Sequence, residues 1–74
     1  MFNRLYELTK RIYENEETPL FIGGIFFCID GNEIIVEYAC GGSAFLSCDS
    51  DITDFMEEIG VPVEKLEKAI NAEF

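Results

Sequence analysis

The chain has 74 residues, of which 49% are hydrophobic and 14% aromatic, and its formal net charge is -10. This length allows one hydrophobic core and the apolar content excludes a disordered acidic tail, so we expect a single folded domain over residues 1–74. No apolar stretch approaches the ~18 to 20 residues of a membrane-spanning helix, and the first residues resemble an amphipathic helix more than a signal peptide, which favours a soluble cytoplasmic protein.

The three cysteines match no disulfide or metal pattern. Cys28, Cys40 and Cys48 are odd in number, no Cys-x-x-Cys spacing occurs, and the sequence contains no histidine. A disulfide framework or a zinc site is therefore not expected, and a reducing cytoplasm fits best. We interpret the three cysteines as small apolar residues of a sheet.

Acidic side chains dominate the middle of the chain. From Ile12 to Glu64 there are twelve acidic residues and no lysine or arginine. A surface of one sign repels nucleic acid and anionic membranes and attracts basic protein surfaces. We therefore expect a basic protein as the partner, with no direct nucleic-acid binding and no membrane binding.

Six elements are predicted, in the order α-β-β-β-α-α. Helical spacing of apolar residues indicates the helices, and runs rich in Ile, Phe and Val indicate the strands. The first helix and the three strands are expected over Phe2 to about Glu17, Leu20 to Asp30, Glu33 to Cys40 and Ser43 to Cys48, and two helices follow, from Asp49-Ser50-Asp51 to Gly60 and from Val61-Pro62 onward. This pattern predicts an α+β fold with a three-stranded antiparallel sheet covered by helices mainly on one face.

The turn residues predict how the strands pair. Gly31-Asn32 is typical of a two-residue hairpin turn, so facing residues on the first two strands should have numbers that sum to 63. Gly23-Gly24 predicts a bulge or bend early in the first strand. The core face then carries Ile25, Phe27, Ile29, Ile34, Val36, Tyr38 and Cys40.

The second sheet face has an apolar centre and an acidic rim. The third strand has an ambiguous register, so its contribution to this face is left open, with Leu46 and Cys48 as candidates. The central and rim residues are Phe26, Cys28, Ile35, Asp30, Glu33 and Glu37. Such a surface fits an interaction site, packing beneath a helix or a self-association interface, and the sequence does not separate these alternatives.

No combination of residues predicts catalysis, a cofactor or a metal site. Activation of a serine or cysteine needs a neighbouring base, and the sequence has no histidine. Asp49, Asp51 and Thr53 match the first ligands of a calcium loop, but Asp54 replaces its glycine and Gly60 its final glutamate. We expect a helix-capping role for this segment and a protein that is not an enzyme.

The helix after Ser50 carries the strongest candidate binding residues. Acidic side chains on one side of a helix repeat every ~5 to 6 Å, comparable with successive phosphates of a nucleic-acid strand. An ordinary solvated helix face is the alternative. The candidate partner-binding residues are Asp49, Asp51, Asp54, Glu57 and Glu58, with Glu33 and Glu37 as the next set.

Small size, an acidic middle and a compact α+β pattern together resemble the phage-encoded inhibitors known as anti-CRISPR proteins, several of which imitate DNA. The stretch from Phe45 to Asn71 is similar, in its strand followed by two helices, to one inhibitor of a type I system, whereas this chain opens with a helix. The resemblance implies a non-enzymatic, phage-encoded inhibitor acting in a host cytoplasm on a nucleic-acid-binding or nuclease complex. It transfers no binding residues.

Two further functions remain open at this point. An acidic adaptor, antitoxin or immunity-type protein would bind a basic partner without imitating nucleic acid. A structural homodimer would form through the sheet face that carries Phe26 and Ile35.

Overall fold

The computed structural model describes residues 1–73 and contains three helices and four strands in that part of the chain. Their bounds are α1 (Phe2–Glu16), β1 (Leu20–Ile22), β2 (Ile25–Asp30), β3 (Glu33–Tyr38), β4 (Ser43–Leu46), α2 (Asp49–Ile59) and α3 (Val63–Glu73). The strands form one antiparallel sheet in the order β1-β2-β3-β4. The fold class is α+β as expected, but the sheet has four strands where three were predicted.

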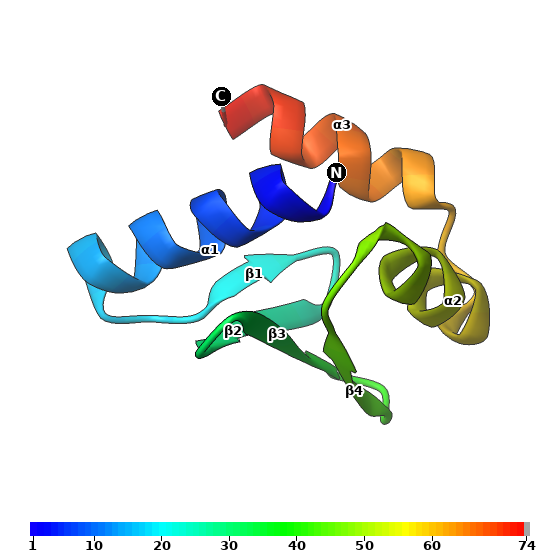
Figure 1. The fold of residues 1–74 in the computed structure, drawn as a ribbon. Helices are drawn as coiled ribbons and strands as arrows, with labels where there is room; N and C mark the ends of the chain where they lie inside the picture. Colours follow the sequence, from blue (N-terminus) through cyan, green and yellow to red (C-terminus); the bar gives the residue numbers. More distant parts are fainter. Residues whose placement is uncertain (74) are drawn as a thin grey trace.

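The helices all lie on the same side of the sheet. Helix α1 lies against β1 and β2, α2 packs against β4, and α3 contacts both other helices (Figure 1). Their buried side chains join those of the strands in one core, which includes Leu5, Leu8, Ile52, Phe55, Met56, Leu66 and Ile70. One sheet face is therefore covered, and no helix within residues 1–73 lies over the other.

The additional strand arises from Gly23-Gly24, which forms a hairpin turn. Ile22 pairs with Ile25 across it, and the two glycines have φ angles of 57° and 84°. Two consecutive residues with positive φ are what a tight hairpin of type I′ requires. The prediction of a bulge in one long strand is wrong, because the apolar run continues through the turn and hydrophobicity alone does not mark the division.

The predicted pairing of β2 with β3 is confirmed at every position. The register runs from Ile25 opposite Tyr38 to Asp30 opposite Glu33. Buried residues alternate along both strands on the predicted core face, with Phe27 and Val36 fully buried. A two-residue turn at Gly31-Asn32 allows only one register for the flanking strands, so this register could be predicted from the sequence.

Two cysteines lie outside the sheet, contrary to the prediction. Cys40 is exposed in the turn after β3, and Cys48 is the exposed residue that precedes α2. Cys28 alone lies within a strand. Strand β3 ends at Tyr38 because the chain reverses at Gly41 and Gly42, so Cys40 does not reach the core face.

The register of β4 resolves the remaining ambiguity. Leu46 pairs with Ile34 and is 1% exposed, whereas Phe45 pairs with Ile35 and is 61% exposed. Neither of the two candidates left open, Leu46 and Cys48, lies on the second sheet face, because Leu46 is in the core and Cys48 precedes α2. Pairing with β3 determines which residues of β4 point to each face of the sheet, and it places Phe45 on the uncovered face.

Candidate protein-binding surface

The uncovered side of the sheet carries a continuous set of apolar side chains, which we call the open face. It consists of Phe21, Phe26, Cys28, Ile35 and Phe45, contributed by all four strands. The rings of Phe21 and Phe26 face each other across β1 and β2 with their centroids 4.6 Å apart. Phe21 and Phe26 are 57% and 40% exposed, so solvent contacts large parts of both rings.

Carboxylates border the open face. Glu37 lies directly between Phe26 on β2 and Ser43 on β4, and Asp30 faces Glu33 beside the Gly31-Asn32 turn. All three acidic side chains are exposed. Like charges placed directly opposite each other on neighbouring strands are destabilising, so the Asp30–Glu33 pairing is a cost that folding alone does not explain.

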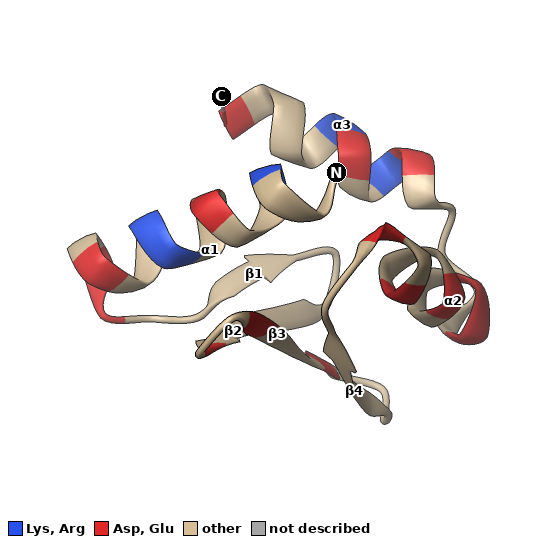
Figure 2. Cartoon of the chain, in the orientation of Figure 1, with Lys and Arg blue, Asp and Glu red and all other residues tan. Residues whose placement is uncertain are grey.

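Charge is unevenly divided between the elements. Helices α1 and α3 carry six acidic and five basic residues, whereas the sheet and α2 carry eight acidic residues and no basic one. In Figure 2 the basic positions lie only on α1 and α3, while α2 shows only acidic ones. The positive charges of the chain are thus concentrated in two of the three helices that cover one side of the sheet.

Asp49, one of the predicted binding residues, joins two helices. Its Oδ1 atom accepts a hydrogen bond from the Phe2 amide at 2.6 Å, and the Met1 amino group lies 3.4 Å away. The hydrogen bond from Phe2 lowers the pKa of Asp49, and the nearby amino group lowers it further while desolvation opposes both. Asp49 therefore holds the start of α1 beside the start of α2.

Asp51 stabilises the start of α2. Its Oδ2 atom accepts hydrogen bonds from both the amide and the hydroxyl group of Ser47, each at 2.9 Å. These bonds, the amide first, lower the pKa of the Asp51 carboxyl. The helix begins after Cys48, which occupies the N-cap position without a side-chain hydrogen bond, so the acids predicted as N-cap residues lie inside the first turn.

The other three acids of α2 project into solvent. Asp54, Glu57 and Glu58 are exposed, and no ion pair with another described residue involves them. They occupy the side of α2 away from its buried residues Ile52 and Phe55.

The predicted binding residues therefore fall into three groups. Asp49 and Asp51 are engaged within the fold, Asp54, Glu57 and Glu58 extend from α2, and Glu33 and Glu37 border the open face. The structure does not bring them into one stripe.

Sequence reasoning missed two residues of the open face, Phe21 and Phe45. Phe21 could have been found by treating Gly23-Gly24 as a two-residue hairpin turn. Ile22 then pairs with Ile25, and Phe21 lies opposite Phe26. No local signal identifies Phe45, because it depends on how β4 pairs with β3.

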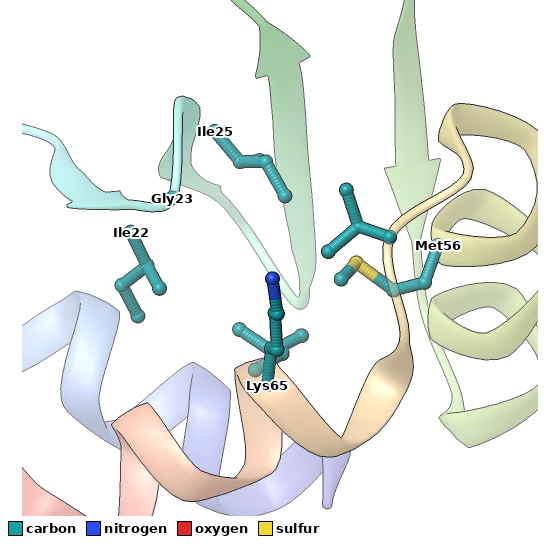
Figure 3. Close-up of a pocket in the computed structure, with 7 residues that line it drawn as sticks. Ile22, Gly23, Ile25, Met56 and Lys65 are labelled. Atoms are coloured by element: carbon teal, nitrogen blue, oxygen red, sulfur yellow. The ribbon is translucent and has the colours of Figure 1, made fainter.

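A pocket of about 220 Å³ opens between the β1–β2 turn, α2 and α3. It is lined by Ile22, Gly23, Ile25, Met56, Val61, Lys65 and Leu66. Figure 3 shows the amino group of Lys65 directed toward its centre. The lining is otherwise apolar and offers no second titratable group with which Lys65 could share acid–base chemistry.

Other signals of chemistry are limited in residues 1–73. No group of three or more metal-ligating side chains occurs there, and no helix there is both long and apolar enough to cross a bilayer. The Cys40 side chain raises the pKa of Tyr38, which is opposite to the activation that a nucleophile or base needs.

Comparison of the chain with protein-family models, with curated proteins and with solved structures gives no match. The functional interpretation therefore depends on the surface described above.

Proposed function

We propose that the protein is a non-enzymatic inhibitor that binds a basic surface of a nucleic-acid-binding protein or nuclease complex. The observation that supports this proposal is the uneven division of charge, with eight acidic and no basic residues on the sheet and α2. Carboxylates there would pair with the lysine and arginine side chains that otherwise contact phosphates, and so exclude the nucleic acid.

A non-catalytic role agrees with the chemistry of the described residues. The apolar pocket contains one titratable side chain, Lys65, and the phenol of Tyr38 has a raised pKa. Acid–base catalysis requires groups whose pKa values are moved toward the working pH. Binding through shape and charge requires neither.

DNA mimicry of the anti-CRISPR kind is the specific form of this proposal. On α2 it would use Asp54, Glu57 and Glu58, which are exposed and lie within two helical turns. The encounter would be fast and strongly dependent on salt, because the partner's positive groove attracts the acidic helix.

The test is capture of the partner by the tagged protein from host lysate, at low and high salt, with and without duplex DNA. The decisive variant combines Asp54→Lys, Glu57→Lys and Glu58→Lys, which leaves Asp49 and Asp51 intact. We expect DNA to displace the wild-type protein and the variant to retain no partner. Retention by the variant would contradict the mimicry proposal.

A matched control changes net charge equally at another surface. Reversing Glu7, Glu14 and Glu16 removes the same number of carboxylates from exposed positions of α1, a helix that carries none of the predicted binding residues. If this control also loses the partner, net charge alone accounts for binding. Circular dichroism of both variants establishes that their helices are intact.

An acidic adaptor, antitoxin or immunity-type protein is the second candidate. It is favoured by Asp49 and Asp51, whose carboxylates are hydrogen-bonded within the fold, which shortens the run of acids available on α2. An adaptor would keep its basic partner in saturating DNA, whereas a mimic would release it.

A further inference from the structure

We propose that the open face is the docking surface for a protein whose contact region is apolar at its centre and carries lysine or arginine at its edge. The inference rests on the proposed function in assuming a basic protein partner, but it does not require imitation of DNA. It assigns the apolar contact to the sheet, in addition to the charged contact proposed for α2.

The apolar part of the argument starts from the strand pattern. A sheet with one solvated face normally alternates between apolar residues facing the core and polar residues facing water. Here the solvated face instead carries apolar residues on all four strands, namely Phe21, Phe26, Cys28, Ile35 and Phe45. Three exposed phenylalanines, on β1, β2 and β4, add nothing to the core and form the kind of apolar patch that marks an interaction site.

The aromatic rings provide anchors for a partner. Phe45 is 61% exposed and Phe21 57% exposed, so most of their surface is still available for burial. Phe26 lies between them in the sheet order, on β2, and its contact with Phe21 restricts both rings. Aromatic side chains that are already held in place lose little conformational entropy on binding and commonly dominate the binding energy.

Charge identifies the chemistry of the occupant. Glu37 lies beside Phe26, and Asp30 faces Glu33, so the border of the apolar patch is acidic. The sheet has no basic residue that could neutralise these groups. A partner with lysine or arginine at the matching positions would relieve the Asp30–Glu33 repulsion on binding.

The same charges disfavour a second copy of this chain. Two open faces placed together would contribute Asp30, Glu33 and Glu37 from each subunit and no cation. Nucleic acid and anionic lipid are disfavoured for the same reason. A protein segment with apolar residues at its centre and lysine or arginine at its edge complements both the apolar patch and its acidic border.

The experiment is selection of a random-peptide phage library on the immobilised wild-type protein, with counter-selection on the Phe21→Thr/Phe45→Thr variant. Threonine favours strands, so the substitutions remove aromatic surface and keep the sheet. We expect enriched peptides that combine lysine or arginine with leucine or aromatic residues. Enrichment of acidic peptides, of neutral peptides or of none would overturn the inference.

An enriched peptide, synthesised with a fluorophore, then tests the residues individually by anisotropy. Phe45→Thr should weaken its affinity at least tenfold, as for an aromatic anchor, and Glu37→Lys should weaken it in a salt-dependent way. The matched controls are Tyr13→Thr, an aromatic residue 54% exposed on α1, and Glu14→Lys on the same helix. Both controls should bind as the wild type does, and an equal loss in them would overturn the inference.

Two further results separate this inference from the proposed function. The α2 variant with three charge reversals should still bind the peptide, because its changes lie outside the open face. If that variant loses the cellular partner but the open-face variant keeps it, the docking inference fails and the proposed function stands. A wild-type dimer in sedimentation that Phe45→Thr dissociates would assign the face to self-association and overturn the inference.

Discussion

Both faces of the sheet carry large apolar side chains, but their surroundings differ. Phe26 and Phe27 are neighbours on β2, yet Phe26 is 40% exposed and Phe27 is completely buried. Alternation of side chains along a strand sends them to opposite faces, and helices cover only the face of Phe27. Hydrophobicity on one face therefore stabilises the fold, whereas the same hydrophobicity on the other remains available for a partner.

Basic residues are found on one side of the sheet only. All five basic residues lie on α1 and α3, which belong to the covered side, and the open face is bordered by carboxylates only. Substitutions on the two faces should therefore differ in their effects on stability.

Phe27→Ala should have the largest effect, lowering the free energy of unfolding by about 3–5 kcal/mol through lost apolar burial and a cavity. The equivalent change on the other face, Phe26→Ala, should cost about 1 kcal/mol, because much of that ring is already in water. Urea denaturation of both variants measures the difference. Equal losses would mean that both faces are buried in solution.

Gly24→Ala tests the turn that positions β1. Its φ of 84° is unfavourable for a residue with a Cβ atom, so we expect a loss of about 1–2 kcal/mol. Gly23→Asn is the control, since asparagine followed by glycine suits this turn type and should be nearly neutral. A neutral Gly24→Ala variant would argue that β1 and Phe21 are placed differently.

Asp51→Asn should produce a smaller effect that depends on pH. The folded pKa of Asp51 is lowered below its ordinary value of 3.8, so its stabilising contribution is present above that pH and is lost as pH falls through the folded pKa. The advantage of the wild-type protein over Asp51→Asn should therefore shrink on acidification. Asp54→Asn, which changes charge equally without losing the Ser47 hydrogen bonds, is the matched control for the change in net charge. Thermal unfolding from neutral to acidic pH measures both.

Phe45→Thr should have the smallest effect on stability, within ~0.5 kcal/mol, because its side chain is mostly exposed and threonine suits a strand. The same substitution should cause the loss of peptide affinity described above. Together the two results would show that Phe45 contributes to peptide binding and not to the stability of the fold. A large loss of stability would instead indicate that Phe45 packs within the fold.

Local signals in the sequence determined much of the backbone. The first helix, the β2–β3 hairpin and the end of α2 at Gly60 follow from helical spacing, from a two-residue turn and from a glycine that adopts a left-handed conformation with φ of 74°. Each signal acts over a few neighbouring residues, so it needs no knowledge of the rest of the molecule. The acidic character of the middle of the chain is likewise a property of the sequence alone.

Tertiary structure decided which surfaces are free. Asp49 has a role in the fold because Phe2, 47 residues earlier in the chain, donates a hydrogen bond to it, and no local pattern predicts such a contact. Phe45 faces water and Leu46 the core because β4 pairs with β3 in one register. Alternation assigns residues to two faces, but only the packing of the helices determines which face is covered.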